Sequence, residues 1–360
     1  MRCSVPRFKE VRMTGKNIAV IGAGAWGTGM AQSLARGGHA VTIWAMEQDV
    51  VDGINERHEN TRFLPGYALS DNLKATTDLY QAAAEKEFLI LASPSLYIAK
   101  TAAQLLAVPS VADGSACIAA LAKGFIPSDD GPKLILETLE NVLPESYRKA
   151  LVYISGPSHA EEVAAGKLTG LIAASENPKN SIRFRELMRV PGLQVYSSLD
   201  VIGVQICAAA KNVIAVVYGC LDAITETSNL FGDNTESYLL AAGLNEIQTL
   251  GFAMGATHAE TFTSIAGVGD LDVTCRSKYG RNRRFGHDII KNNILSPYKN
   301  LDDIIAHIGD IGYLAEGVVA CKYVHEITER LNLKLPISDG LYRILNREIE
   351  PIDFLKEILN

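Results

Sequence analysis

Three glycines in the spacing G-x-G-x-x-G constrain this chain more than any other feature. They occur in Gly22-Ala-Gly24-Ala-Trp-Gly27, after the short apolar run 16–22 and at the start of the segment 26–37, which has helical spacing. A second apolar run follows at 40–44. A strand, a glycine-rich turn, a helix and a second strand within about 30 residues form one βαβ unit of a parallel sheet. The sequence therefore predicts a fold of the dinucleotide-binding kind.

The three glycines have separate roles in such a turn. Gly22 permits the tight turn, Gly24 lets a pyrophosphate approach the backbone, and Gly27 allows the helix to pack closely on the strand. The helix N-terminus then offers unpaired N–H groups and the positive end of its dipole to the phosphates. A purely structural turn is the alternative, and the flanking strand and helix favour dinucleotide binding.

The end of the second expected strand indicates which dinucleotide fits. The chain leaves this strand as Trp44-Ala-Met46-Glu47-Gln-Asp49, without Lys or Arg. A carboxylate can accept a hydrogen bond from an adenosine 2′-hydroxyl, whereas a 2′-phosphate calls for an arginine. We therefore expect NAD(H) to be preferred, with NADP(H) as the second option. The alternative is that this acidic stretch only solvates a loop, and that a Lys or Arg from elsewhere in the chain reaches the 2′ position.

The rest of the chain divides into two parts. Further apolar runs, each bounded by Pro, Gly or Ser, lie at 88–92, 116–120 and 151–154. Long helical segments are expected at 201–222, 236–255, 300–308 and 314–331. The predicted fold class is α/β, with a Rossmann-like doubly wound parallel sheet at 16–200 and a separate all-helical domain at 201–360. Residues 1–15 are expected to be an extension outside the fold.

One lysine interrupts a long apolar segment. The stretch from Val201 to Leu221 is nearly all apolar, with Lys211 at its centre. Because a cation in hydrocarbon is costly, a buried helix is favoured over a membrane span. Burial lowers the pKa of a lysine, and a second cation such as Lys123 would lower it further. A lysine tuned toward neutrality can exchange a proton with an alcohol or a carbonyl oxygen. The alternative is a structural lysine satisfied by backbone carbonyls or by a carboxylate such as Asp270.

Two further segments carry charge suited to a small anion. Lys123 follows an expected strand, at the crevice end where open α/β folds bind ligands, although an isolated surface lysine fits the pattern equally well. Five cations occur in the nine residues from Arg276 to Arg284, and the planar fork of arginine suits phosphate. A solvated basic loop is the alternative. Asn212 is suited to orienting a lysine or a substrate, and Asp270 to accepting a substrate hydroxyl or capping its own turn.

Composition excludes several classes of function. Lys and Arg total 34 against 41 for Asp and Glu, and a net charge of −7 argues against nucleic acid and anionic membranes as partners. The six cysteines form no CxxC pair, which argues against a disulfide framework or a zinc site and fits a reducing, cytoplasmic compartment. No metal is expected. His39 and His159 lack a partner pattern in the sequence and are expected to be structural.

Taken together, these segments resemble the NAD(P)-dependent glycerol-3-phosphate dehydrogenases, from Ile18 to about Ile344. The motifs that carry the resemblance are Gly22-Ala-Gly-Ala-Trp-Gly-Thr28, Asn60-Thr-Arg-Phe-Leu-Pro-Gly66, Lys123-Gly124, Ser155-Gly-Pro-Ser158-His-Ala160, Ala210-Lys211-Asn212-Val213, Ala266-Gly-Val-Gly-Asp270-Leu, Arg281-Asn282-Arg283 and Ala315-Glu316-Gly317. The resemblance implies reversible conversion of dihydroxyacetone phosphate and sn-glycerol 3-phosphate with NAD(P)H as hydride carrier. It also implies a supply of glycerol phosphate for phospholipid synthesis and a homodimer formed by the helical domain.

The resemblance also implies roles for individual residues. Lys211 matches the family's proton donor and acceptor. Substrate contacts are expected at Lys123, Gly156, Ser158, Lys211, Asn212, Asp270, Thr274, Arg281 and Asn282. Cofactor contacts are expected at Gly22, Gly24, Ala25, Trp26, Gly27, Met46, Phe63, Lys123, Ala160, Arg281, Leu314 and Glu316.

Several positions depart from the family pattern. Ala25 stands where many members have Ser, and Gly280 replaces a serine that commonly contacts substrate. Met46 occupies a position that is basic in some NADP-using members, which supports the NAD preference. His159 replaces a common Phe, and residues 225–234 form a longer loop than usual. These departures affect the expected loop conformation more than the expected reaction.

Two other functions stay open at this point. One is an oxidoreductase of similar plan that acts on a 3-hydroxy acid or on 6-phosphogluconate, which would need a carboxylate-binding pattern around the lysine. The other is a non-catalytic NADH sensor, which would keep the glycine turn but would not need Lys211.

Overall fold

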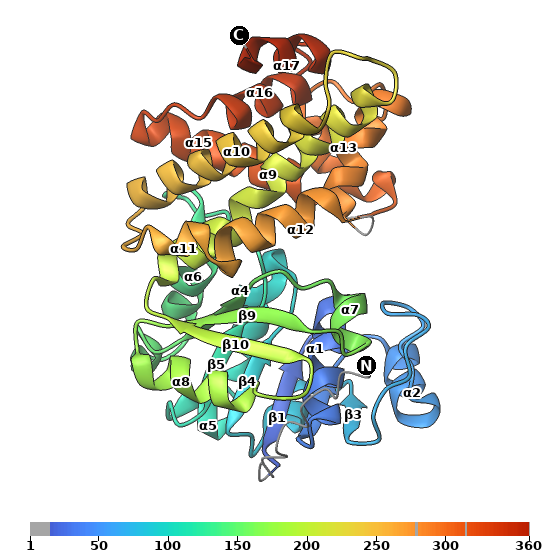
Figure 1. Ribbon diagram of the computed structural model, residues 1–360. Coiled ribbons are helices and arrows are strands. Elements are labelled where there is room, and N and C mark those ends of the chain that lie inside the picture. Colours follow the sequence, from blue (N-terminus) through green and yellow to red (C-terminus); the bar gives the residue numbers. More distant parts are fainter. Residues whose placement is uncertain (1–14, 278–279, 314, 360) are drawn as a thin grey trace, which may run out of the picture.

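The computed structural model describes residues 15–277, 280–313 and 315–359. A sheet with helices on both sides forms one half of the molecule, and a cluster of helices forms the other (Figure 1). We refer to them as the sheet region and the helical region. The expected cofactor contact Leu314, the basic residue Lys278 and the extension up to residue 14 lie outside the described residues.

The sheet region is built on eight strands in the order β10-β9-β8-β5-β4-β1-β2-β3. Their bounds are β1 Asn17–Ile21, β2 Ala40–Trp44, β3 Leu73–Thr76, β4 Phe88–Leu91, β5 Cys117–Ala120, β8 Val152–Ser155, β9 Thr169–Ala174 and β10 Leu193–Ser198. The order reverses between β1 and β4, which both border the glycine-rich turn. In open α/β sheets the carboxyl ends of the strands at such a point form the ligand-binding crevice.

Both faces of the sheet are covered, because side chains of a strand alternate between faces. In β1, Ile18 and Val20 belong to one core cluster, whereas Ala19 and Ile21 belong to another. The helices of this region are α1 Ala25–Arg36, α2 Gln48–Arg57, α3 Leu79–Ala83, α4 Ser95–Leu105, α5 Pro109–Ala112, α6 Ile135–Val142, α7 Ala160–Ala164 and α8 Pro178–Leu187. This burial on both faces explains why β1 is an uninterrupted apolar run.

One part of the sheet differs from the expected parallel arrangement. Strand β9 pairs with β8 in the antiparallel direction, and β10 is parallel to β9. The link between Ser155 and Thr169 carries only the short helix α7, which packs on α1. The chain therefore re-enters the sheet in the opposite direction instead of completing a helical crossover. The sheet is mostly parallel, as predicted for a Rossmann-like fold, with two reversed strands at one edge.

The helical region is organised around α9 (Val201–Thr225), a 25-residue helix that is buried along nearly its whole length. The other helices are α10 Asp233–Ala253, α11 Glu260–Thr263, α12 Asp270–Arg276, α13 Arg281–Lys291, α14 Leu301–Ala306, α15 Glu316–Leu331, α16 Pro336–Leu345 and α17 Pro351–Leu359. Among the described residues, α9 is the one helix long and apolar enough to cross a membrane, and 94% of its apolar window is buried inside the protein. The prediction of a buried core helix is confirmed.

Small residues bring α9 and α13 unusually close. A Cβ atom added at Gly219 would lie 2.0 Å from the carbonyl oxygen of Arg283, and one at Gly286 would lie 1.9 Å from that of Val216. Only glycine fits at these two crossings. The close packing holds the beginning of α13 beside the middle of α9, where Lys211 lies.

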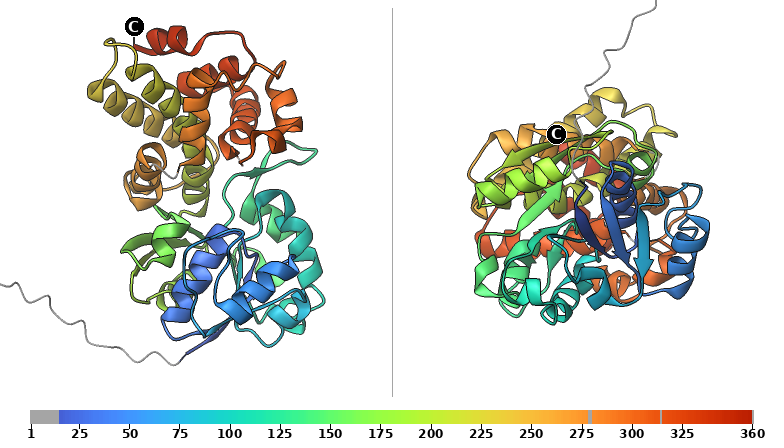
Figure 2. Two further views of the ribbon diagram at one scale, coloured as in Figure 1. Left: turned by 90° about the vertical axis from the view of Figure 1, so that its right-hand side faces the viewer. Right: turned by 90° about the horizontal axis from the view of Figure 1, so that it is seen from below.

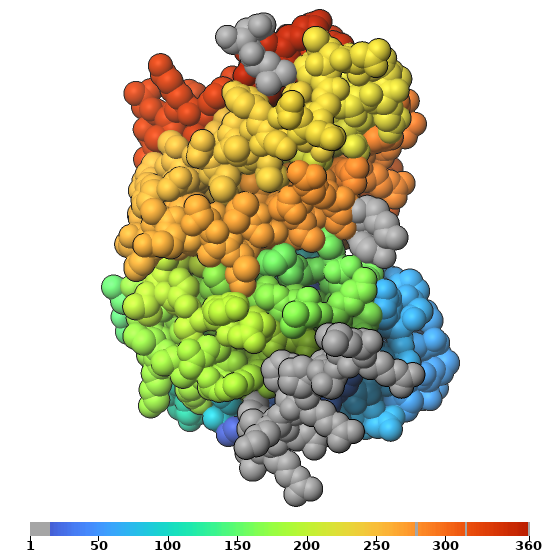
Figure 3. Space-filling model, in the orientation of Figure 1, coloured from blue at the N-terminus to red at the C-terminus, as the bar shows by residue number. Residues whose placement is uncertain are grey.

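A hairpin of the sheet region, between β5 and α6, contacts the helical region along one side of the molecule (Figure 2). Its strands are β6 (Phe125–Ile126) and β7 (Lys133–Leu134). The Arg330 guanidinium in α15 donates a hydrogen bond of 3.0 Å to the carbonyl oxygen of Asp130 at the hairpin loop. The helical region also rests directly on the sheet region in the space-filling view (Figure 3). Residues from both regions can therefore meet in one site.

Candidate active site

The glycine turn has the geometry that a dinucleotide pyrophosphate requires. Gly22 has φ +121°, and a Cβ atom added at Gly27 would lie 2.0 Å from the carbonyl oxygen of Gly22. A Cβ atom added at Gly24 would meet nothing within 4 Å. Helix α1 has neither a side-chain cap nor an acidic residue in its first turn. The first and third glycines are thus needed for the fold, whereas the second leaves open space where a pyrophosphate could approach the helix N-terminus.

A cleft of about 500 Å³ begins at this turn and ends at the helical region. Its lining residues are Gly24, Ala25, Trp26, Gly27, Arg62, Phe63, Ala92, Ser93, Pro94, Ser95, Leu121, Ala122, Lys123, Ser158, His159, Ala160, Glu161, Arg281 and Glu316. A cavity of about 650 Å³ lies elsewhere, between Ile224, Ile344 and Pro351 of the helical region, and its described lining includes none of the predicted site residues. The cleft therefore joins the expected cofactor residues to the expected substrate residues.

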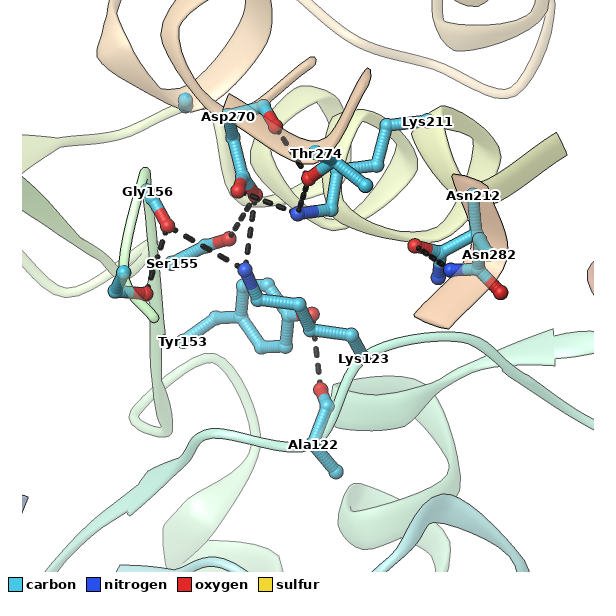
Figure 4. Close-up of polar contacts among 12 residues, drawn as sticks. Ala122, Lys123, Tyr153, Ser155, Gly156, Lys211, Asn212, Asp270, Thr274 and Asn282 are labelled. Atoms are coloured by element: carbon cyan, nitrogen blue, oxygen red, sulfur yellow. Dashed lines mark hydrogen bonds and ion pairs between the residues drawn. The ribbon is translucent and has the colours of Figure 1, made fainter. Parts of the chain in front are cut away.

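Behind Lys123 lies a cluster of two lysines and one carboxylate (Figure 4). The Lys123 ammonium lies 2.9 Å from Asp270 Oδ2 and 3.4 Å from the carbonyl oxygen of Gly156. The Lys211 ammonium donates hydrogen bonds to Asp270 Oδ1 and, over 2.7 Å, to Thr274 Oγ1. Asp270 is the first residue of α12 and is only 1% exposed. The carboxylate thus bridges a lysine from the sheet region and a lysine from the helical region.

The charges of this cluster determine how easily Lys211 loses its proton. Burial lowers the pKa of Lys211 to about 8, the neighbouring Asp270 carboxylate opposes that decrease, and Lys123 adds to it. Burial would raise the pKa of Asp270, but the ammonium groups of Lys123 and Lys211 hold it below its ordinary value. The predicted decrease in the Lys211 pKa is confirmed. The carboxylate contact, which the sequence offered as the structural alternative, is present at the same time.

Two asparagines form a second polar group beside Lys211 (Figure 4). The Asn282 Nδ2 atom donates to Asn212 Oδ1 over 2.9 Å, and Asn282 Oδ1 accepts a hydrogen bond from the Gly317 N–H over 2.8 Å. Both asparagines are buried. The Asn212 Nδ2 atom is buried with no hydrogen-bond partner among the described residues. Because buried donors are ordinarily satisfied, this amide suits a ligand that brings an oxygen acceptor.

Fewer cations of the basic stretch after Asp270 lie at the cleft than the sequence predicted. Arg276 pairs with Asp272 on its own helix, and Arg283 pairs with Asp222 of α9 over 2.6 Å. Arg284 lies over the ring of Tyr313 and pairs with Asp288. The expectation of an anion site made by the whole stretch is therefore wrong for these three arginines, because none of them belongs to the described lining of the cleft. Among the described cations of the stretch, only Arg281 lines the cleft.

The other predicted residues lie at varying distances from the cleft. Those that line it are Ala25, Trp26, Phe63, Ser158, Ala160 and Glu316. Ser158 Oγ donates to the carbonyl oxygen of Gly156 over 2.8 Å, in the same turn that contacts Lys123. Met46 is 77% exposed and is absent from the described cleft lining. The expected contact of Met46 with a cofactor therefore stays a prediction.

Several residues around the cleft were not singled out from the sequence. Ser93 and Ser95 follow β4, and the rule that ligands bind at the carboxyl ends of strands could have indicated them. His159, expected to be structural, lies in the cleft wall, and burial lowers its pKa. His39 is structural as predicted: its Nδ1 accepts from the Lys16 N–H, and its Nε2 lies 2.9 Å from the Leu187 carbonyl oxygen.

Comparisons with known proteins point to one family. The models described as NAD-dependent glycerol-3-phosphate dehydrogenase N-terminus and C-terminus match residues 17–181 and 200–356. A glycerol-3-phosphate dehydrogenase [NAD(P)+] of Treponema denticola is 59% identical over 348 residues, covering 95% of this chain and 98% of that protein. A protein of the same name from Treponema pallidum is 54% identical over 352 residues, covering 95% and 99%. The crystal structure of glycerol-3-phosphate dehydrogenase from Coxiella burnetii has a TM-score of 0.81 at 30% identity and covers 96% of this chain and 99% of its own. This chain belongs to the NAD-dependent glycerol-3-phosphate dehydrogenase family.

Proposed function

We propose that this protein interconverts dihydroxyacetone phosphate and sn-glycerol 3-phosphate with NAD(H), in the cleft that begins at the glycine turn and ends at the helical region. The observation that carries the proposal is the buried Lys211 ammonium, held by Asp270 behind the cleft-lining Lys123. A hydroxy-acid substrate would need a carboxylate-binding arrangement around the lysine, whereas Lys211 is surrounded by Asp270, Thr274 and a second lysine.

In this proposal the chain's own groups orient the substrate and move one proton. The nicotinamide, when bound, supplies or accepts the hydride. Lys211 donates its proton to the C2 oxygen during ketone reduction and removes it during alcohol oxidation. A pKa of about 8 suits both directions, because each protonation state is populated near neutral pH. Asp270 keeps the ammonium oriented, and the Asn212 amide offers its unused N–H to a substrate oxygen.

The phosphate of the substrate is assigned to the beginning of α13. Arg281 is the first residue of this helix and lines the cleft, and no described residue caps the helix with its side chain. An arginine and the N–H groups of a helix N-terminus together favour a phosphate. We expect Arg281→Ala to raise the KM for dihydroxyacetone phosphate about 10- to 100-fold, the usual value of a charge-assisted contact. Steady-state kinetics measure this, and Arg276→Ala, which removes an arginine held by Asp272 outside the cleft, serves as the control. An unchanged KM would remove Arg281 from the phosphate site.

The direct test of the function is the oxidation of NADH on addition of dihydroxyacetone phosphate, repeated with NADPH. We expect turnover with both dinucleotides and a kcat/KM ratio of NADPH to NADH below one, since no cation follows β2 before Asp49. A 3-hydroxy acid and 6-phosphogluconate in place of dihydroxyacetone phosphate should give no turnover. Activity with one of these acids alone would contradict the proposed substrate, and a ratio well above one would contradict the proposed preference.

We also propose a cytoplasmic enzyme that supplies glycerol phosphate for phospholipid synthesis and forms a homodimer through its helical domain. The described cysteines are free and buried, which fits a reducing compartment. The division into domains at 16–200 and 201–360 belongs to the same proposal and is supported by the start of α9 at Val201. Sedimentation analysis tests the dimer against the 38.9 kDa mass of one chain.

A further inference from the structure

We propose that Arg62 is the residue through which this protein accepts a 2′-phosphate, so that use of NADP(H) depends on Arg62 while use of NAD(H) does not. This inference rests on the proposed function, because it assigns the choice of dinucleotide in the same cleft. It concerns a residue that lies 18 positions after the end of β2 at Trp44, in the loop that follows α2.

The loop that carries Arg62 is attached to the glycine turn. Asn60, which is 1% exposed, donates hydrogen bonds of 2.9 Å to the carbonyl oxygen of Ala23 and to Thr28 Oγ1. Its own side-chain oxygen accepts from the Phe63 N–H over 3.1 Å. Arg62 lies between these two anchored residues and lines the cleft next to the turn. The hydrogen bonds of Asn60 therefore fix the backbone on both sides of Arg62 relative to the glycine turn, where the dinucleotide is expected to bind.

The Arg62 guanidinium also lies near the end of β2, where the 2′-hydroxyl of NAD(H) is distinguished from the 2′-phosphate of NADP(H). It lies 3.5 Å from Asp49 Oδ1, in the first turn of α2, which directly follows β2. It lies over the Phe63 ring, 5.3 Å from the ring centre. In folds of this kind the 2′ position of the adenosine ribose lies at the end of the second strand. Arg62 thus supplies, from a different segment, the cation that the residues after β2 lack.

The other cations of the cleft are committed elsewhere. Lys123 is bound to Asp270 and Gly156, and Arg281 belongs to the helical region at the opposite end. Among the described lining residues, Arg62 is the one remaining Lys or Arg. Its partner Asp49 is 66% exposed at its side chain, so the ion pair is open to solvent and to exchange.

The pair of Arg62 and Asp49 accounts for the use of two dinucleotides. A ribose with a free 2′-hydroxyl leaves the ion pair intact and finds carboxylate acceptors in Asp49 and Glu47. A 2′-phosphate must take the guanidinium from Asp49 and tolerate these two carboxylates. A guanidinium group binds phosphate with two parallel hydrogen bonds, so Arg62 can leave Asp49 for the 2′-phosphate. The negative charges of Asp49 and Glu47 repel that phosphate and weaken its binding. This ordering agrees with a preference for NAD(H) and a secondary use of NADP(H).

The test compares Arg62→Ala with the parent protein. We expect kcat/KM for NADPH to fall about 10- to 100-fold, as for loss of a charge-assisted phosphate contact, with kcat/KM for NADH changed less than about twofold. Binding without turnover gives a second readout: by calorimetry, adenosine 2′,5′-bisphosphate should lose affinity and adenosine 5′-monophosphate should not. Asp49→Asn should have the opposite effect and raise the affinity for the 2′,5′-bisphosphate.

Arg57→Ala is the matched control. Arg57 has the same side-chain exposure as Arg62, 51%, and pairs with Glu59, but it is absent from the described cleft lining. It should leave both dinucleotides unaffected. An equal loss for NADH and NADPH in Arg62→Ala, or no loss for either, would overturn the inference. If the nucleotides bind as expected while neither dinucleotide supports reduction of dihydroxyacetone phosphate, the inference stands and the proposed function fails.

Discussion

Replacing Lys211 by alanine is expected to lower kcat for dihydroxyacetone phosphate reduction by about 10³-fold or more. Loss of a positioned proton donor costs about 10²- to 10⁴-fold in rate, and loss of the charge that stabilises a developing oxyanion adds to this. The KM for NADH should change little, because Lys211 is absent from the described lining of the cleft that begins at the glycine turn. Single-turnover and steady-state rates, measured beside NADH binding by fluorescence, separate these two effects.

The comparison needs a variant that keeps the packing of α9. Lys211→Met retains the length of the side chain without its charge, so a similar loss in both variants assigns the effect to the amine. Asp270 keeps Lys123 as a partner at 2.9 Å in both, so we expect the fold to persist, and thermal unfolding monitors this. Lys86→Ala is a control for removing a half-buried lysine, because Lys86 contacts Thr42 in the sheet region, outside the cleft. A loss of kcat below about tenfold would fit an NADH sensor rather than the enzyme.

The parts of the fold that depend on local pattern could be predicted from the sequence. The glycine turn, the strand before it and the helix after it follow from residue types within a few positions of one another. The burial of α9 follows in the same way, because the long apolar run around Lys211 leaves no polar face for solvent. A lysine in such a place must lose hydration, so the direction of its pKa change could also be predicted.

The contacts that complete the candidate site depend on positions far apart in the chain. Asp270 is 59 residues from Lys211 and 147 from Lys123. The sequence offered it as one possible partner of Lys211, but nothing near Asp270 shows that it would also bind Lys123. The prediction that the basic stretch 276–284 forms an anion site failed for the same reason. The carboxylate that holds Arg283 comes from α9, 61 residues away. The reversed direction of β9 likewise depends on how α7 packs on α1, which is a tertiary choice.

Asp270→Asn is expected to move the pH dependence of kcat toward lower pH in both reaction directions. Reduction of dihydroxyacetone phosphate uses protonated Lys211, so in the parent protein its rate should fall as the pH rises through about 8, the pKa of Lys211. Oxidation of sn-glycerol 3-phosphate uses the neutral amine and should rise over the same range. The Asp270 carboxylate raises the pKa of Lys211, whereas burial and Lys123 lower it. Removing the carboxylate leaves the two lowering influences unopposed, so less protonated Lys211 remains at neutral pH.

The readout that isolates this effect is kcat rather than kcat/KM. The second ionisation of a substrate phosphate, near a pKa of about 6, enters kcat/KM and would overlap the enzyme's own titration. With both substrates saturating, the pH at which kcat changes reports the pKa of Lys211 in the substrate-bound enzyme. This pH should shift when the charge next to Lys211 is removed. Asp272→Asn is the matched control, because Asp272 lies on the same helix but is half-exposed and paired with Arg276. If the pH at which kcat changes shifted equally in both variants, or in neither, the titrating group would not be the lysine that Asp270 holds.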